Sequence, residues 1–190
     1  HARVVVGLTA AQRETCDAVL ALGTQWLQQR SLTLDLHEYP ENTLTETEIV
    51  ARLARNVAPE SELVGVLGSD VFLAGVWWKV LAQLLRDGPE GARGIALGYR
   101  DPAERDCAGL PAPHRAVRRT NGRVLGLVQT DVWEHAFLNG GAINTSWEDR
   151  LYAAAVELGR WCVAPAGRSV IQVLSINRPR GEPVGDFMWW

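Results

Sequence analysis

The chain has 190 residues, of which 47% are hydrophobic and 22% are charged, and its formal net charge is -3. This balance is typical of a folded domain with a hydrophobic core, and it excludes a disordered chain of low hydrophobicity. The small negative charge provides no field that attracts nucleic acid, and no run of about eighteen apolar residues predicts a membrane span. Because the N-terminal residues lead straight into a strand pattern, we expect no signal peptide and a cytoplasmic protein.

The first part of the chain alternates strand and helix patterns. Residues 3–8 (RVVVGL) form a β-branched run typical of a buried strand, and residues 11–29 place apolar side chains on one approximate helical face. Residues 32–37 (LTLDLH) alternate apolar and polar side chains, which predicts a second strand. A helix then begins at Thr45, where Glu48 three residues later indicates a capping box.

The second part continues this alternation. Its predicted strands are residues 63–67, 94–99, 124–129 and 169–175, and its predicted helices are residues 72–86 and 146–162. Two connecting segments, residues 100–122 and 131–144, are expected to be irregular. The sequence therefore predicts strands and helices in turn over most of its length.

This alternation predicts βαβ units and a parallel sheet with helices on both faces. We expect an α/β, flavodoxin-like fold, in which a doubly wound parallel five-stranded sheet has the order 2-1-3-4-5. The strand at residues 169–175 is additional. One domain spans residues 1–176 in this interpretation, and residues 177–190 form a C-terminal tail rich in Pro and Gly. The ligand of such a sheet lies at the carboxyl ends of the strands.

Three loops at those strand ends hold the candidate cofactor-binding residues. The first loop joins a strand to a helix whose free N–H groups and dipole favour a phosphate. The second and third loops follow the third and fourth predicted strands. In chain order, the candidates are Thr9, Gln12, Arg13 and Thr15 in the first loop, Ser69, Asp70, Val71 and Phe72 in the second, and Tyr99, Arg100 and Asp101 in the third.

Each loop also has a plainer interpretation that the sequence leaves open. Thr9 caps the first helix, and Ser69 or Asp70 caps the third. Arg100 forms a surface ion pair with Asp101 or Glu104. The sequence contains neither GxGxxG nor a Walker lysine motif, so it supports neither a Rossmann nor a P-loop nucleotide site.

The remaining reactive and aromatic residues predict no separate site. His114 and His135 stand alone and are expected to be structural or exposed. The cysteines are far apart and lack metal-ligand spacing, so we expect reduced thiols and no metal. Trp77 and Trp78 lie in a helix of core spacing, and we expect one ring in the core and the other facing a partner.

The order of these segments resembles the NAD(P)H-dependent FMN reductases of flavodoxin-like fold, over about residues 3–162. Residues 75–81 (GVWWKVL) are similar to the family's "PG-x-LKN-x-LD" helix, with Lys79 at the family's lysine. Residues 131–141 and 147–161 resemble the loop and helix that end the family's domain. The resemblance thus covers most of the predicted domain.

This resemblance implies a flavin-dependent oxidoreductase. FMN would place its phosphate on the first loop and its ring against the second and third, and NAD(P)H as co-substrate would deliver a hydride to the flavin. The cofactor performs the chemistry, so no catalytic side chain is implied. The resemblance also implies a homo-oligomer, commonly a dimer, against which Trp189 and Trp190 of the tail would pack. The other partner would be a small-molecule substrate or electron acceptor.

Two other functions stay open, because the cofactor loops depart from the family. The first loop lacks the proline of the family's "G-S-P-R-x-x-S-x-T", and the second keeps none of Tyr, Asn and Gly of "P-x-Y-N-G-S". A flavodoxin-fold protein that has lost FMN would act as a binding module or partner subunit through its tryptophan surfaces. A different enzyme on this fold would act on a small aromatic or nucleotide-like ligand.

Overall fold

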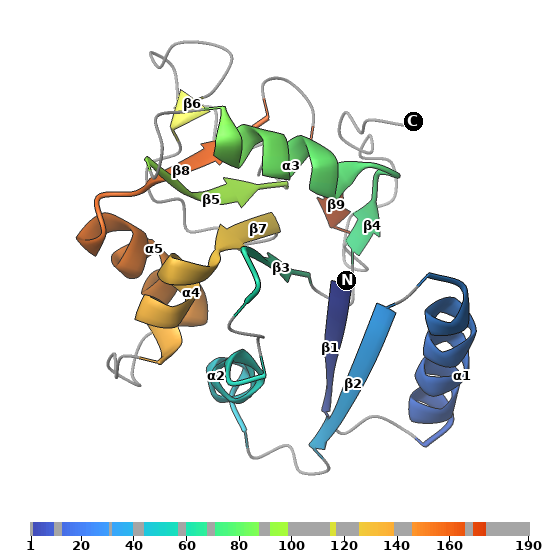
Figure 1. Ribbon diagram of the computed structural model, residues 1–190. Coiled ribbons are helices and arrows are strands. Elements are labelled where there is room, and N and C mark those ends of the chain that lie inside the picture. Colours follow the sequence, from blue (N-terminus) through green and yellow to red (C-terminus); the bar gives the residue numbers. More distant parts are fainter. Residues whose placement is uncertain are drawn as a thin grey trace, which may run out of the picture. The chain divides into compact units, whose positions relative to one another are not determined.

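The computed structural model shows a mixed α/β protein, so the predicted class is confirmed, and strands and helices alternate from β1 to β3 (Figure 1). The structure describes residues 2–9, 13–30, 32–39, 44–56, 60–67, 71–87, 92–98, 115–116, 126–138, 146–165 and 169–173. The chain groups into two compact units, the first built from His1–Ala58 and Ala142–Trp147 and the second from Pro59–Gly141 and Glu148–Trp190. The predicted boundary between domain and tail, at residues 176 and 177, lies outside the described residues.

The first unit contains a strand–helix–strand–helix segment. β1 (Ala2–Thr9) and β2 (Leu32–Tyr39) pair in parallel over their whole length. α1 (Arg13–Arg30) connects them, since parallel neighbours need a crossover rather than a hairpin. α2 (Glu46–Ala54) follows, and the two helices lie on opposite sides of the strand pair, α1 against β2 and α2 against β1 (Figure 1). All four elements lie where the sequence predicts them.

A glycine in β1 allows α2 to approach the strand pair closely. A Cβ atom on Gly7 would lie 2.8 Å from Cδ1 of Leu53 and 3.4 Å from Cγ2 of Ile49. These two side chains are four residues apart in α2, so they project from the same side of the helix. They form the apolar contact of α2 with β1, and a larger residue at position 7 would have to displace the Leu53 side chain.

The predicted capping box closes the N-terminus of α2. The backbone N–H of Glu48 donates to Oγ1 of Thr45 (3.3 Å), and the backbone N–H of Thr45 donates to Oε2 of Glu48 (2.7 Å). The second bond favours the ionised carboxylate. The backbone N–H of Thr45, followed by its hydroxyl, therefore lowers the pKa of Glu48.

We expect Thr45→Ala to destabilise the protein by about 1 kcal/mol at neutral pH, the usual cost of removing an N-cap hydroxyl. The pKa of Glu48 is lower in the folded than in the unfolded state, so the folded state binds this proton less readily. Its contribution is therefore complete above the ordinary carboxyl pKa and is lost as pH falls through the lowered value. Urea unfolding across the acidic range measures both effects.

Glu48→Gln is the matched control for the pH dependence. Glutamine preserves a capping box but does not titrate, so the free-energy difference between this variant and the wild-type protein should shrink as pH falls. A difference between Glu48→Gln and the wild-type protein that stays constant down to about pH 3 would contradict the role of the charged carboxylate.

A mixed five-stranded sheet forms the centre of the second unit. In order across the sheet its strands are β3 (Leu63–Val66), β7 (Gly126–Gln129), β5 (Arg93–Leu97), β8 (Trp161–Ala164) and β6 (Arg115–Ala116). β5 and β8 are parallel, whereas β7 is antiparallel to both β3 and β5, and β6 is antiparallel to β8. β1 and β2 form a separate parallel pair, whereas the five-stranded sheet contains both parallel and antiparallel neighbours.

Helices lie on both sides of this sheet. α3 (Trp77–Arg86) packs against β5, β7 and β8, and α4 (Thr130–Phe137), which contacts β3 and β7, lies with α5 (Trp147–Glu157) on the other side (Figure 1). A separate antiparallel pair joins β4 (Val71–Leu73) to β9 (Ile171–Val173). β9 lies within the predicted additional strand.

The main apolar core of the second unit lies between α3 and the sheet. Its buried members are Ala74, Leu81, Ala82, Leu84, Leu85, Ala96, Leu127, Val163, Val170 and Ile171. A Cβ atom on Gly98 would lie 2.6 Å from Ile171 and 3.1 Å from Leu81, so the backbone after β5 also contacts this cluster. Burial of these apolar side chains is the principal driving force for forming this unit.

The predicted parallel sheet of order 2-1-3-4-5 differs from the observed pairings. β1 and β2 are parallel neighbours as predicted, but β7 is inserted between β3 and β5 and runs antiparallel to both. The physical reason is that a short apolar run shows that a strand is buried on both faces, but not in which direction it runs.

In three segments the observed secondary structure also differs from the prediction. The predicted loop at residues 131–144 contains α4, and the predicted helix at residues 72–86 is preceded by β4. The predicted helix at residues 146–162 ends earlier, and β8 follows it.

A Schellman motif ends α5 early. Gly159 has φ +67°, its N–H donates to the carbonyl of Val156 (3.0 Å), and the N–H of Arg160 donates to the carbonyl of Ala155 (2.7 Å). Glycine adopts this left-handed conformation without the steric cost of a Cβ atom. The chain therefore turns at Gly159, and Trp161 and Cys162 enter a strand instead of continuing the helix.

Candidate functional site

The first candidate loop lies at the carboxyl ends of β1 and β2. Their parallel register places Thr9 beside Tyr39 as the last residue of each strand. Arg13 is the first residue of α1 and Thr15 lies in its first turn, whereas Gln12 lies outside the described residues. A helix that begins shortly after a strand directs its free N–H groups to this edge, which is the arrangement that favours an anion.

Polar side chains follow one face of this strand pair towards the same edge. Asp35, His37 and Tyr39 alternate along β2, so they lie on one face. Nε of Arg3 on β1 donates to Oδ2 of Asp35 (2.6 Å), and the two side chains form an ion pair. Both are partly exposed, so this pair contributes at most about 1 kcal/mol.

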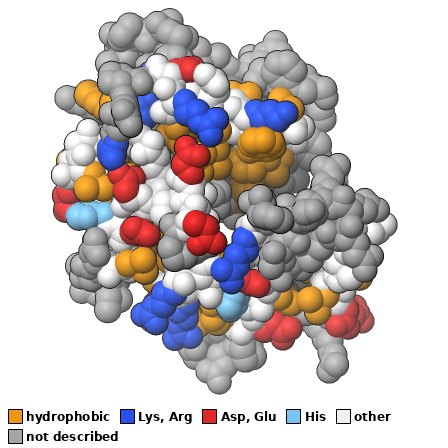
Figure 2. Space-filling view, in the orientation of Figure 1, with side chains coloured by type: hydrophobic (Ala, Val, Ile, Leu, Met, Phe, Trp, Pro, Cys, Tyr) orange, Lys and Arg blue, Asp and Glu red, His pale blue; other side chains and the backbone are white. Residues whose placement is uncertain are grey.

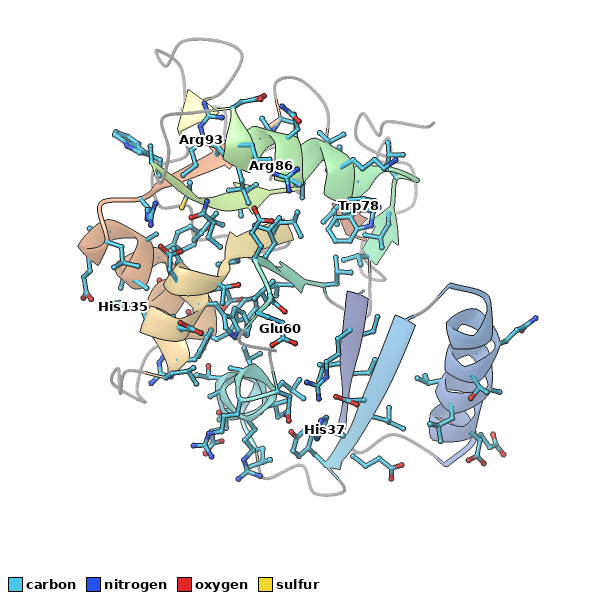
Figure 3. All side chains as sticks on the ribbon, viewed as in Figure 1. His37, Glu60, Trp78, Arg86, Arg93 and His135 are labelled. Carbon is cyan, nitrogen blue, oxygen red and sulfur yellow. The ribbon has the colours of Figure 1, made fainter. Side chains whose placement is uncertain are left out.

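The polar face also carries an aromatic and cationic contact. The guanidinium carbon of Arg52, on α2, lies 6.0 Å from the centre of the Tyr39 ring. His37, which lies beside Gly7 in the register, is half-buried on the same face (Figure 3). These residues are not among the candidates predicted from the sequence, although the alternation of Asp35, His37 and Tyr39 in a strand pattern is a signal for them.

The electrostatics of this edge are mixed. Arg52 brings positive charge near Tyr39, while Glu14 in the first turn of α1 is exposed and interacts favourably with the positive end of the helix dipole. A bound phosphate would therefore share the helix terminus with at least this carboxylate.

The second candidate loop is partly a strand. Val71 and Phe72 belong to β4, where they pair with Val173 and Gln172 of β9, and Val71 packs against the core. This corrects their placement in an open loop. The residues of β4 are apolar or aromatic, and such residues favour a strand when a partner strand lies beside them. Ser69 and Asp70 lie outside the described residues.

The third candidate group, Tyr99, Arg100 and Asp101, also lies outside the described residues. The residue before it is Gly98, whose carbonyl accepts hydrogen bonds from the N–H groups of Val170 (2.8 Å) and Ile171 (2.9 Å). Since Ile171 also pairs with Leu73, the segments that lead to the second and third groups meet at the start of β9. The first group belongs to the other unit.

A second set of polar contacts connects α4 to the end of α5. Nε2 of His135 lies 2.7 Å from Oε2 of Glu157, and Arg160 forms an ion pair with Asp131 (Figure 3). His114 lies outside the described residues.

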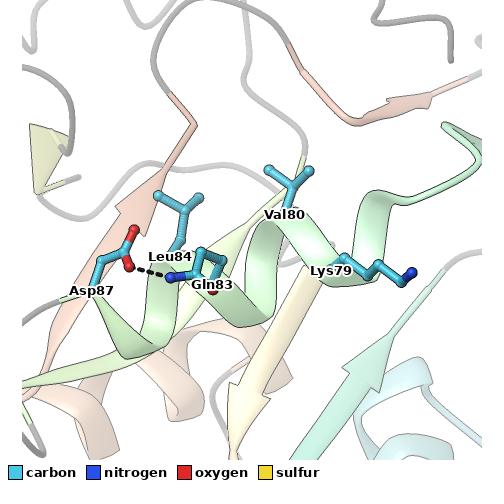
Figure 4. A pocket seen from close by; sticks show the side chains of 5 residues that line it. All are labelled: Lys79, Val80, Gln83, Leu84 and Asp87. Atoms are coloured by element: carbon cyan, nitrogen blue, oxygen red, sulfur yellow. Dashed lines mark hydrogen bonds between the residues drawn. The ribbon is translucent and has the colours of Figure 1, made fainter.

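A shallow groove of about 460 Å³ lies along the outer side of α3, lined by Lys79, Val80, Gln83, Leu84 and Asp87 (Figure 4). Nε2 of Gln83 donates to Oδ1 of Asp87 (2.5 Å) at one end of the groove. At the other end, Nζ of Lys79 lies 5.4 Å from the centre of the Trp78 ring. The sequence analysis did not predict this groove.

The described part of the chain contains no group of three or more His, Cys, Asp or Glu side chains placed to hold a metal ion. It also contains no helix with the length and apolar character needed to cross a membrane. Cys162 is a buried free thiol, and burial raises its pKa to about 12, so the reactive thiolate is scarce at neutral pH.

Comparison with protein-family models finds no match for this chain, and comparison with curated proteins finds none. The functional argument therefore depends on the chain's own residues and geometry.

Proposed function

We propose that the protein is a flavin-dependent oxidoreductase resembling the NAD(P)H-dependent FMN reductases, with FMN at the carboxyl ends of its first strands. One observation carries the proposal: Thr9 and Tyr39 end a parallel strand pair side by side, shortly before the N-terminus of α1 in the chain. Free N–H groups at a helix start favour a phosphate, and an aromatic ring beside them suits a planar ligand.

The residues at this edge fit a phosphate-bearing ligand. Arg52 supplies a cation near Tyr39, and the sequence places Thr9, Arg13 and Thr15, with two hydroxyl donors and a second cation, around the start of α1. When bound, FMN supplies the ring that accepts a hydride, and NAD(P)H supplies the hydride. The role of the chain is to bind and orient, so a general acid or base is not required.

The proposal includes a flavodoxin-like arrangement of the first strands. The parallel pairing of β1 with β2, with helices on both sides of the pair, supports this part of it. The candidates of the second and third loops belong to the other unit, so the proposal rests on the first loop.

The visible absorption spectrum of the purified protein tests this function. We expect a flavin band that bleaches when NADH or NADPH is added without oxygen. If the protein is purified without its cofactor, added FMN should lose fluorescence as it binds. A colourless protein that leaves FMN fluorescence unchanged at every concentration would refute the proposal.

Arg13→Ala tests the place of the phosphate. We expect FMN to bind about 10- to 100-fold more weakly, because a hydrogen bond to a charged group contributes about 1.5–3 kcal/mol. Arg30→Ala, at the opposite end of α1, is the matched control and should leave the affinity unchanged. Riboflavin, which has no phosphate, should bind both variants equally. An unchanged FMN affinity in Arg13→Ala would contradict the proposed phosphate position.

A second candidate is a flavodoxin-fold protein that has lost FMN and acts as a partner subunit. It is favoured by the exposure of Trp78, whose side chain is 50% exposed while Trp77 packs against the core. Figure 2 shows a hydrophobic patch at the position where Figure 3 labels Trp78. Large exposed apolar rings are typical of contact surfaces. A protein that shows no flavin band and leaves the fluorescence of added FMN unchanged would support this candidate instead.

A further inference from the structure

The groove on the outer side of α3 has an apolar floor and a cation at one end. Val80 and the buried Leu84 form the floor (Figure 4). Lys79 lies at the end nearer the start of the helix, it is exposed, and none of the ion pairs between described residues includes it. The groove therefore favours an occupant that brings an apolar side chain together with a carboxylate.

The two ends of this groove differ in their electrostatic potential. The first turn of α3 contains no acidic residue, so the positive end of the helix dipole adds to the charge of Lys79. The opposite end holds the carboxylate of Asp87, which accepts a hydrogen bond from Gln83. A carboxylate of the occupant is thus attracted to the Lys79 end and repelled from the Asp87 end.

The C-terminal part of the sequence has the composition that such an occupant needs. Residues 186–190 read DFMWW, which is one carboxylate followed by four large apolar side chains. They belong to the tail, which lies outside the described residues. Leaving apolar side chains in water costs about 25 cal/mol per Å² of their surface, so a groove that covers part of this run is favourable to it.

We propose that residues 186–190 dock in this groove of α3. Asp186 then lies at Lys79, and Met188 lies over the apolar floor. In an extended segment, side chains two residues apart share a face and lie roughly 6.6 Å apart. Along α3, Lys79 and Leu84 are five residues apart, which is about 7.5 Å. The spacing of Asp186 and Met188 therefore matches the distance from the cation to the far part of the floor.

The chain before this segment is long enough to reach the groove. β9 ends at Val173, and its first residue, Ile171, belongs to the same core cluster as Leu81 of α3. Residues 174–186 can span roughly 40 Å when extended, whereas α3 is roughly 15 Å long. A tether of this length holds the segment at a high effective concentration, so even a weak contact is populated.

The methyl signal of Met188 tests this contact directly, because this methionine is the only one in the sequence. Labelling of the full chain with ¹³C-methyl methionine therefore gives one NMR signal. We expect it to be shifted from the random-coil position and to show nuclear Overhauser effects to the methyl groups of Val80 and Leu84. A signal at the random-coil position without these effects would overturn the inference.

Charge reversal tests the ion pair between the segment and the groove. Asp186→Lys or Lys79→Glu alone should lower the docking equilibrium constant about 5-fold and move the methyl signal towards the random-coil position. The double variant restores opposite charges and should recover the wild-type signal. Glu182→Lys makes the same charge change elsewhere in the tail, and this matched control should leave the signal unchanged. A double variant that recovers nothing, or a control that acts as strongly as Asp186→Lys, would refute the pairing.

A second copy of the chain and a partner protein are the alternative occupants, and the same signal distinguishes them. Docking within one chain predicts a Met188 signal that does not depend on protein concentration. Overhauser effects that fade on dilution would show that the tail of a second copy fills the groove, and a random-coil signal at every concentration would leave it to a partner protein. Either result overturns the inference. None of these measurements uses flavin, so they fail or succeed independently of the proposed function.

Discussion

Gly126→Ala is expected to destabilise the protein by at least about 3 kcal/mol, because the added methyl group meets backbone rather than movable side chains. A Cβ atom on Gly126 would lie 2.0 Å from the carbonyl oxygen of Ala96 and 3.0 Å from the backbone nitrogen of Gly98. β7 is held between β3 and β5 by pairing on both sides. Neither neighbour can move away without breaking its hydrogen bonds to β7.

Gly65→Ala is the matched control, since it places the same methyl group in the neighbouring strand. The nearest atoms to a Cβ atom on Gly65 are side-chain carbons of Leu127 and Trp77, both at 3.6 Å, which is ordinary contact. We expect a change within about 1 kcal/mol, and alanine is better suited than glycine to a strand. Urea unfolding measures both variants. Equal stabilities would show that the backbones of β5 and β7 are not in the close contact described.

Cys162 is expected to react with iodoacetamide roughly 1000-fold more slowly in the folded than in the unfolded protein. Burial raises the pKa of this thiol from 9.0 to about 12, and only the thiolate attacks the reagent. At about pH 8, a difference of this size lowers the thiolate fraction roughly 1000-fold. Mass spectrometry of the peptide that contains Cys162 measures its labelling separately from that of the other cysteines.

The same labelling in concentrated urea is the control, because unfolding exposes every thiol. A folded protein that labels at Cys162 as fast as the unfolded protein would contradict the burial of β8. It would also contradict the pairing of Cys162 with Ile95 across the parallel strands β5 and β8.

The sequence by itself predicted the elements whose signals are local. The capping box of Thr45 and Glu48 was predicted correctly, because both of its hydrogen bonds join residues three apart. The strands that became β1, β2, β3 and β5 were also predicted, since runs of apolar or alternating residues show which segments are extended and buried. The outward position of Trp78 and the inward position of Trp77 were consistent with the helical spacing.

The candidate site could be predicted only in part. The sequence predicts that Thr9 and Arg13 lie near each other, because a strand leads into a helix at this point. That Tyr39 lies beside Thr9 follows from the parallel register, which joins residues thirty positions apart. The groove on α3 likewise depends on which side of the helix the sheet covers.

Only the tertiary structure decided how the strands of the second unit pair. The run that became β7 is apolar throughout, and such a run has the same appearance whether its neighbours are parallel or antiparallel. β4 and β8 became strands because partners lie beside them: β9 beside β4, and β5 and β6 beside β8. Local residue patterns therefore determined which segments are helices and which are strands. Pairing between distant segments determined how the strands form sheets, because strand pairing depends on contacts that no single segment encodes.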